Sequence, residues 1–345
     1  MNPQKPTQKD IAKLAGVSQP LVSLVLSEAS APVAKEARER VLEAARQLGY
    51  PPLRGRRKKS HRSRKLLAYI RPSVERSNQT DYRLLDSYDD FFNQIQNLLV
   101  EHAYAAGYEM IVRPYARPVE VTHWLIEWGV EGVFWHSNDE LLAQWISARY
   151  PTVQINRHFR INADSVLSNQ EEIVMQAIHH LRGHGHERIA LLSQSRTDTA
   201  VRERNRTYLA YVREHGLPCY EQWMCEEDLD KIADYLATRP SDGPTALILG
   251  DLQALHIQGR LRKAGLSLPE ELSMVGIDNI SAAEFSNPRL TSIDLQLQEV
   301  INAAMSVMAS RIENASGATQ KIEVSPRLVV RDSVFRREGA ATLHH

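Results

Sequence analysis

The 345-residue sequence predicts two parts, a small all-α N-terminal domain and a larger α/β body built on parallel sheets. Three observations predict this division. A helix-turn-helix pattern opens the chain, charge is distributed unevenly along it, and strand-like apolar runs alternate with amphipathic stretches from residue 66 onward. Because 43% of the residues are apolar, the chain can build ordinary hydrophobic cores and wholesale disorder is not expected.

The segment from residue 7 to residue 27 predicts two short helices joined by a tight turn. Thr7 is expected to cap the first helix, and apolar residues recur behind it at helical spacing. Gly16 can take the left-handed conformation that ends this helix, and Ser18 is expected to cap the second, with Pro20 in its first turn. The usual partner of this motif is the major groove of DNA, although the same pattern also occurs in bundles that bind no nucleic acid.

Charge separates the N-terminal part from the body. The first 65 residues hold 15 Lys/Arg and 5 Asp/Glu, whereas the rest of the chain holds 27 and 37. A formal net charge of zero therefore hides a head of about +10 on a body of about −10. This asymmetry indicates a polyanion-binding module joined to a domain with another role.

A third helix, expected over residues 35–48, completes the small domain. Gly49 ends it, and a Tyr-Pro-Pro sequence at residues 50–52 follows. The basic run at residues 53–65 has almost no apolar content. It is consistent with a solvated tether or with a phosphate-tracking arm that orders on DNA, and both descriptions can hold at different times.

The body alternates apolar runs typical of buried parallel strands with amphipathic helical stretches. The expected strands are residues 66–70, 109–112, 130–135, 152–155, 188–192, 246–249 and 272–277. The expected helices include residues 90–106, 171–182, 202–215 and 252–264. Because parallel sheets bind ligands at the carboxyl ends of their strands, the side chains that follow the strands are binding-site candidates. They are Arg71, Ser73, His136, Asn156, Arg157, Asp251 and Asp278.

The sequence contains no recognisable catalytic or metal-binding motif. It lacks a GxGxxG fingerprint, a P-loop and a nucleophile elbow, and none of its 13 His falls into a metal-ligand spacing. Cys219 and Cys225 are expected to be incidental reduced thiols. With no apolar run near 18 residues and no signal-peptide pattern, we expect a cytoplasmic protein that is not an enzyme, has no cofactor or metal and binds no membrane.

Several long motifs resemble the lactose-repressor/galactose-repressor (LacI/GalR) family of bacterial transcriptional regulators. In the head these are DIAKLAGVS and VAKEARERVLEAARQLGYPP. In the body they are HLRGHGHERIALL, LPEELSMVGIDNISAAEFSNPRLTSID and PRLVVRDSV. The motifs occur in the family's order and span nearly the whole chain.

The resemblance implies a lambda-repressor-like helix-turn-helix DNA-binding domain at residues 1–52, a basic linker or hinge at 53–65 and a tail at 336–345. Between them it implies a two-lobed, periplasmic-binding-protein-like α/β domain for effector binding and dimerisation at residues 66–335. Lobe 1 is expected to hold about residues 66–165 and 294–323, and lobe 2 about 166–293 and 324–335. The implied assembly is a homodimer, and the tail has no heptads that would add a tetramer-forming helix.

The family's base-reading positions correspond here to Gln19, Pro20 and Leu24. Family members often carry Arg at the last of these, and Arg to guanine is the commonest specific contact, whereas Leu24 offers only apolar contact, for example to a thymine methyl. Gln19 can pair with adenine through its amide. Leu24 could instead pack against the third helix, although helical spacing favours its neighbours for the core. Phosphate-contacting positions correspond to Thr7, Ser18 and Ser23.

The linker departs from the family's hinge, in which a short helix wedges a leucine into the minor groove. Gly55 weakens a helix by about 1 kcal/mol relative to Ala, and Lys59 stands at the wedge position. We therefore expect the linker to act electrostatically, giving steeply salt-dependent DNA binding. The cations expected to contact phosphate are Arg54, Arg56, Arg57, Lys58 and Lys59.

Two effector-binding positions of the family are retained, Arg204 and Asp278. An opposed arginine and aspartate suit a polyol, whose hydroxyls both donate and accept hydrogen bonds, although an interlobe salt bridge or a capped strand end would also explain them. Gly250 and Asn169 stand where the family usually has Asn and Asp, which puts an ordinary hexose in doubt. Further candidate effector-binding residues are Ser73, His136, Arg157 and Trp223.

The sequence thus predicts a sequence-specific transcriptional regulator, most simply a repressor, that binds a pseudo-palindromic double-stranded operator as a homodimer. Its operator affinity would be controlled by a small effector, a sugar or sugar derivative, bound between the lobes. One alternative is a sugar-binding protein or enzyme that uses the same body, which the head and the missing catalytic residues argue against. Another is a regulator with a degenerate, effector-independent pocket.

Overall fold

The structure is a computed structural model that describes residues 7–26, 34–48, 65–72, 82–115, 118–193, 198–224, 228–314 and 316–337. Several predicted residues lie outside these ranges. They are Ser73, Cys225, the linker cations Arg54, Arg56, Arg57, Lys58 and Lys59, and the tail beyond residue 337.

Three helices form the N-terminal unit: α1 (Gln8–Ala15), α2 (Gln19–Leu26) and α3 (Lys35–Gln47). Thr7 occupies the N-cap of α1, where its backbone N and its Oγ1 both donate to Asp10 Oδ2 over 2.7 Å. Gly16 ends this helix in the left-handed region, with a φ of 63°. The predicted cap, turn and pair of helices are therefore confirmed.

The three helices enclose a small apolar core. Its fully buried centre combines Ile11 of α1, Val22 of α2 and Val41 of α3. The remaining buried members are Ala15, Val25, Leu26, Ala44 and Ala45. Leu14 is one of the apolar residues at helical spacing behind Thr7, but it is half exposed, so the buried face of α1 is narrower than the sequence pattern suggests.

The first lobe of the body contains a six-stranded parallel sheet in the order β10-β5-β4-β3-β1-β2. Its strands are β1 (Leu66–Pro72), β2 (Glu109–Tyr115), β3 (Gly132–Trp135), β4 (Thr152–Ile155), β5 (Asp164–Ser168) and β10 (Lys321–Val324). Buried strands such as Val-Phe-Trp in β3 are apolar on both faces, as expected for a parallel sheet covered by helices.

The second lobe contains a five-stranded sheet in the order β11-β9-β8-β7-β6, in which only β11 runs antiparallel to its neighbour. Its strands are β6 (Ile189–Leu191), β7 (Ala246–Gly250), β8 (Ser273–Ile277), β9 (Thr291–Asp294) and β11 (Arg327–Val329). The predicted two-lobed α/β body is thus confirmed.

Helices and a short 3-10 turn connect the strands. They are α4 (Tyr82–Ala105), α5 (Pro118–Trp128), α6 (Glu140–Ser147), α7 (Gln170–Gly183), α8 (Thr199–Glu214), η1 (Glu221–Trp223), α9 (Leu229–Ala237), α10 (Asp251–Lys263), α11 (Ser281–Phe285) and α12 (Leu297–Glu313). Of the helices described, none is long and apolar enough to cross a membrane.

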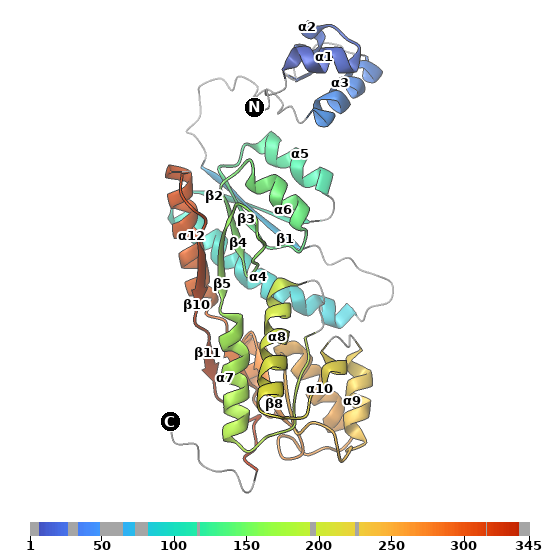
Figure 1. Cartoon of the computed structure of the whole chain (residues 1–345), viewed down its shortest axis with the longest axis vertical. Helices are drawn as coiled ribbons and strands as arrows, with labels where there is room; N and C mark the ends of the chain where they lie inside the picture. Colours follow the sequence, from blue (N-terminus) through green and yellow to red (C-terminus); the bar gives the residue numbers. More distant parts are fainter. Residues whose placement is uncertain are drawn as a thin grey trace. The chain divides into compact units, whose positions relative to one another are not determined.

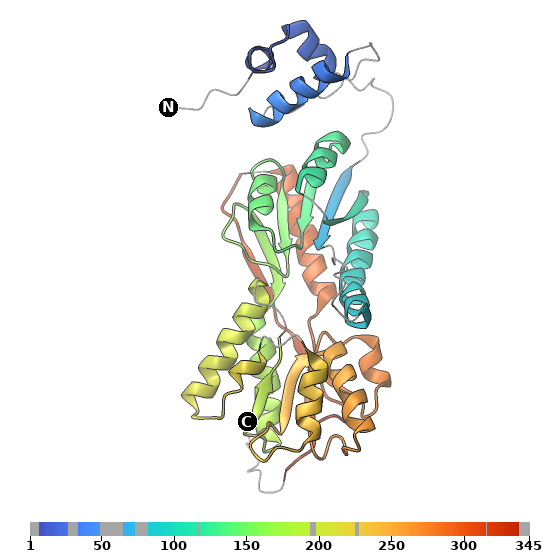
Figure 2. The same cartoon turned by 90° about the vertical axis from the view of Figure 1, so that its right-hand side faces the viewer.

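The chain passes between the two sheets three times, after Ser168, after Asp294 and after Val324. Figures 1 and 2 show the consequence: the late, red segments α12 and β10 lie beside the blue-to-green strands of the first lobe. One hydrophobic cluster continues through both lobes, from Leu67 and Phe134 in the first sheet to Ile248 in the second. The lobes therefore share part of their core at the crossings.

All seven predicted strands are present, with ends shifted by at most three residues. Four further strands and the helices α5, α6, α9, α11 and α12 were not among the elements named from the sequence. The predicted lobe boundaries at residues 166 and 324 fall inside β5 and β10, which belong entirely to the first sheet. Helix α4 begins at Tyr82, eight residues before the predicted start.

Candidate functional site

Helix α2 has an exposed N-terminal end and a buried inner face. Gln19 and Pro20 are exposed there, next to the exposed Ser18, whereas Ser23 and Leu24 are half buried. Leu21, which helical spacing favoured for the core, is also only half buried, and Leu26 is buried instead. The predicted base-reading side chains thus start from the same helix, but Leu24 is only partly accessible.

Thr7 uses its hydroxyl within α1. The hydroxyl and the backbone N–H both donate to Asp10, and these two bonds are the main reason why the pKa of Asp10 is lowered. A phosphate contact requires a hydrogen-bond donor, so DNA would have to compete with Asp10 for this proton. The sequence could have revealed this capping pair, because an acidic residue three positions after Thr is its signature.

In the body, the predicted side chains gather at the carboxyl ends of the parallel strands of both sheets. His136 directly follows β3, and Asn156 with Arg157 directly follows β4 in the first lobe. Asp251 and Asp278 directly follow β7 and β8 in the second lobe. We call this region, where bonds between the lobes form, the interlobe junction.

His136 lies in an aromatic enclosure on the first-lobe side of the junction. Its Nδ1 is 3.0 Å from the hydroxyl of Tyr69, and the rings of Phe91 and Phe92 meet it edge-on. Its Nε2 is buried and has no hydrogen-bond partner among the described residues. Burial, with a smaller contribution from Arg157, holds the pKa of His136 well below its usual value, so the ring is neutral at pH 7.

Arg157 bonds to both lobes. Within the first lobe its Nε donates to Asn138 Oδ1 (2.9 Å) and its Nη1 donates to the Asn156 carbonyl (2.7 Å). Its Nη2 is 2.7 Å from Oδ2 of Asp198, which caps α8 in the second lobe. Asp198 was not among the predicted site residues, because nothing in the sequence indicates its ion pair with Arg157.

Arg204 and Asp278 interact electrostatically on the second-lobe side of the junction. The guanidinium of Arg204 lies near enough to lower the pKa of Asp278, but burial outweighs it and raises that pKa to about 6. Arg204 Nε donates to Gln170 Oε1 over 2.7 Å. Gln170, at the start of α7 after the first crossing, was also missed by sequence analysis.

Asp251 is a structural neighbour of this pair. Ser292 Oγ donates to its Oδ1 over 2.6 Å, and the Ile280 backbone N donates to its Oδ2 over 2.8 Å. It is completely buried, and burial together with the nearby charge of Asp278 raises its pKa well above the usual value. Gly276 makes room for this carboxylate, because a Cβ at that position would overlap Oδ1 of Asp251.

Trp223 and Asn169 have local structural roles. Trp223 is 9% exposed and packs in the second-lobe core against the rings of Tyr220 and Tyr235. The structure therefore shows a core contact for Trp223 and no contact with the other predicted effector residues. Asn169 caps α7, since its Oδ1 accepts from the Glu172 backbone N over 2.9 Å.

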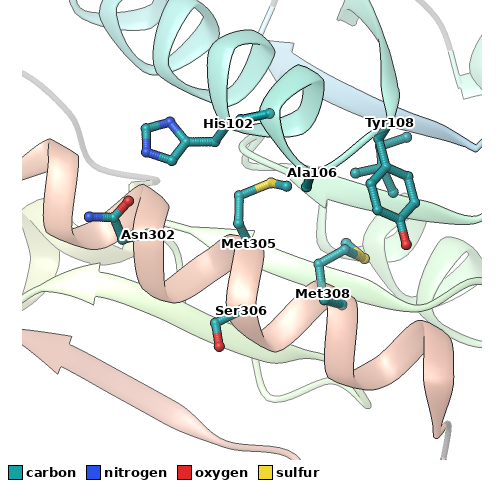
Figure 3. A pocket seen from close by; sticks show the side chains of 10 residues that line it. His102, Ala106, Tyr108, Asn302, Met305, Ser306 and Met308 are labelled. Carbon is teal, nitrogen blue, oxygen red and sulfur yellow. The ribbon is translucent and has the colours of Figure 1, made fainter.

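A pocket of about 380 Å³ lies elsewhere in the first lobe, between α4 and α12. Figure 3 shows His102, Tyr108, Met305 and Met308 around it, and none of the predicted effector residues lines it. Within the described parts of the chain, no group of three or more His, Cys, Asp or Glu is arranged to hold a metal ion.

Two family models match the chain. The model for bacterial regulatory proteins of the lacI family matches residues 7–52, and the model for a periplasmic binding protein-like domain matches residues 178–334. The chain is also similar over nearly its whole length to curated repressors. The "HTH-type transcriptional repressor PurR" of Vibrio vulnificus is 28% identical, covering 95% of this chain and 98% of that protein. Its Pasteurella multocida counterpart is 27% identical, covering 96% and 99%.

Solved structures share the fold. The lac repressor dimer bound to operator and the anti-inducer ONPF is 20% identical with a TM-score of 0.65, covering 96% of this chain and 100% of that one. The regulator CelR in complex with cellobiose is 22% identical with a TM-score of 0.64, covering 95% and 99%. A ribose-bound LacI-family regulator from Enterococcus faecium is 19% identical with a TM-score of 0.67, covering 79% and 100%.

Proposed function

The chain belongs to the LacI family of bacterial transcriptional regulators, and we propose that it represses transcription at a pseudo-palindromic operator under the control of a small carbohydrate-like effector. LacI-family proteins are DNA-binding regulators and not enzymes. The effector would bind between the lobes of each subunit of a homodimer and change the arrangement of the two heads.

The observation that carries the effector proposal is the pair Arg204 and Asp278. Among the residues described, no hydrogen-bond partner reaches the terminal nitrogens of Arg204 or the carboxylate of Asp278. A guanidinium that can only donate and a carboxylate that can accept suit a ligand whose hydroxyls do both. His136 adds a third unsatisfied group, its buried Nε2. A buried polar atom without a partner costs roughly 1–3 kcal/mol, which a ligand hydroxyl would recover.

For DNA, we propose that Gln19, Pro20 and Leu24 face base edges in the major groove while Ser18 and Ser23 donate to phosphates. The exposure of the first turn of α2 supports this assignment. Thr7 serves the cap of α1, since both of its donors face Asp10. The cations of the linker would supply sequence-independent attraction.

The test of DNA recognition is selection of bound sites from genomic DNA, followed by titration of the best site at several salt concentrations. We expect a two-fold symmetric site. Because each neutralised phosphate contributes about one unit to the slope of log K against log salt, Lys58→Gln should lower that slope by about one. An unsymmetric or sequence-independent set of sites, or an unchanged slope, would contradict the proposal.

The test of effector control is isothermal calorimetry with a panel of sugars and sugar acids. A ligand that binds wild type and loses at least about tenfold in affinity with Arg204→Gln would support the proposal. Glu270→Gln, an exposed second-lobe carboxylate, serves as the control. If no member of the panel binds, the second candidate, an effector-independent regulator, is favoured. That candidate has its own support in the ion pair of Arg157 and Asp198, which already connects the lobes.

A further inference from the structure

The ion pair between Arg157 and Asp198 joins two segments that belong to different lobes. Arg157 follows β4 of the first sheet, and Asp198 precedes α8 of the second lobe. Nη2 and Oδ2 are 2.7 Å apart, and the two side chains are only 7% and 15% exposed. A second contact lies beside it, where the His158 backbone N donates to Thr199 Oγ1 over 3.4 Å.

Each partner is held in place within its own lobe. Asn138 Oδ1 and the Asn156 carbonyl accept hydrogen bonds from Nε and Nη1 of Arg157, which leaves Nη2 for Asp198. The other oxygen of Asp198, Oδ1, accepts from the backbone N of Ala200 and Val201. Because both groups are positioned before they meet, the pair loses little conformational entropy when the lobes come together.

Because the pair is buried, removing either partner is costly in free energy. An exposed ion pair is screened by salt and contributes little, whereas removing one member of a buried pair leaves a charge without compensation. The pair also fixes the N-terminus of α8, the helix that carries Arg204. The position of Arg204 relative to the first lobe therefore depends on Arg157.

We propose that Arg157 and Asp198 form an intramolecular latch that holds the two lobes together in the absence of any small molecule. The contact between the two lobes is then maintained by side chains of the protein and needs no bound ligand. An effector would meet lobes that are already in contact, and any transition to an open arrangement must break the latch. This inference goes beyond the proposed function and does not depend on DNA binding or on the identity of an effector.

The experiment compares the ligand-free, full-length protein with two variants that break the pair, Arg157→Met and Asp198→Asn. The first keeps most of the side-chain volume without the charge. The second keeps the helix cap, since an asparagine oxygen can accept the same backbone N–H groups of Ala200 and Val201. Small-angle X-ray scattering reports the separation of the lobes, and amide hydrogen exchange at His158 reports the contact beside the latch.

We expect both variants to scatter as more extended particles than wild type and to exchange the His158 amide at least about tenfold faster. Arg311→Met is the matched control, because Arg311 and Asp164 form a similar buried pair within the first lobe, at 2.7 and 2.9 Å. It should lower thermal stability while leaving the lobe separation at the wild-type value.

If Asp198→Asn keeps both the wild-type scattering curve and the wild-type exchange rate at His158, the latch does not hold the lobes and the proposal is wrong. The same conclusion follows if Arg311→Met opens the lobes as much as the latch variants do. Should Arg157→Met fail to fold, Asp198→Asn decides the question, because its shape and cap are conserved. Arg157→Lys, which retains the charge but loses the bonds to Asn138 and Asn156, should give an intermediate exchange rate.

Discussion

The two sides of the interlobe junction use their polar groups differently. On the first-lobe side, Arg157 is bonded to Asn138, to the Asn156 carbonyl and to Asp198. On the second-lobe side, the terminal nitrogens of Arg204 and the carboxylate of Asp278 have no hydrogen-bond partner in the described structure. One arginine is thus bonded through several of its donors to its own chain, whereas the other uses only its Nε in this way.

This difference shows that two arginines at one junction need not share a role. A guanidinium whose donors are satisfied by its own chain fixes geometry, whereas one with free donors can recognise a partner. The same distinction applies elsewhere in the molecule. Thr7 is satisfied by Asp10, and His180 has a buried Nε2 without a partner among the described residues.

The largest expected effect is a loss of stability when the space for Asp251, next to Asp278, is filled by a side chain at position 276. Gly276→Ala would push a methyl group into Asp251 Oδ1 and to 2.8 Å from Leu290. We expect a loss of roughly 3 kcal/mol in the free energy of unfolding, measured by urea denaturation. Gly259→Ala, at a helix position with open space around it, should instead raise stability by about 0.5–1 kcal/mol. Equal effects of the two substitutions would show that Asp251 is not held rigidly.

Asp278→Asn tests whether the second-lobe carboxylate is kept without a partner. The folded-state pKa of about 6 lies above the ordinary value of 3.8, so the stability contributed by this group is present below pH 4 and lost as the pH rises through 6. Between pH 4 and pH 7 the variant should therefore gain about 2–3 kcal/mol relative to wild type. Urea denaturation across this range measures the change, and a pH-independent difference would mean that Asp278 has a partner.

His180 extends the comparison to a half-buried imidazole in the last turn of α7. Burial, followed by the charges of His184 and His186, lowers the pKa of His180 to about 4. Its stability contribution is therefore present above pH 6.5 and lost as the pH falls toward 4. From pH 7 to pH 5, wild type should lose about 2 kcal/mol that His180→Leu does not lose. Thermal melts at both pH values test this, and parallel losses in the two proteins would contradict it.

Thr7→Val gives the smallest expected effect and tests a hydroxyl that already has a hydrogen-bond partner, Asp10. Removing the hydroxyl should cost about 0.5–1 kcal/mol of helix stability, because Asp10 loses one of its two bonds to the cap. Operator affinity, measured by fluorescence anisotropy, should stay within about twofold of wild type, because the hydroxyl proton is already bonded to Asp10. A larger loss, comparable to that of Ser23→Ala, would return Thr7 to the group of phosphate contacts.

Elements with a local signal could be predicted from the sequence. Apolar runs between amphipathic stretches located seven strands, and the capping and turn residues Thr7, Gly16 and Ser18 located the first two helices of the head. The strands that were missed, such as β5 and β10, are short and partly polar, and they are recognisable only from their pairing with each other. The end-of-strand rule and the resemblance together brought Arg204 and Asp278 to one place.

Contacts that depend on packing could not be predicted. Asp198 lies 41 residues from Arg157, and its capping role gave no indication of the second contact. Trp223 was a candidate effector-binding residue, but its indole lies in the core with Tyr220 and Tyr235. A tryptophan in a short connection carries no sequence signal that distinguishes these two environments.

The three crossings also constrain the order in which the parts of the protein can fold during its synthesis. The edge strand β10 pairs with β5, and the edge strand β11 pairs with β9, so each sheet receives its last strand from residues 321–329. Domains generally fold as units while the chain emerges from the ribosome, N-terminal first. The head can therefore form early, whereas both lobes stay incomplete until residues 321–329 have been translated. Chains truncated before residue 321 would expose an unpaired strand on each sheet, which makes them substrates for chaperones or aggregation.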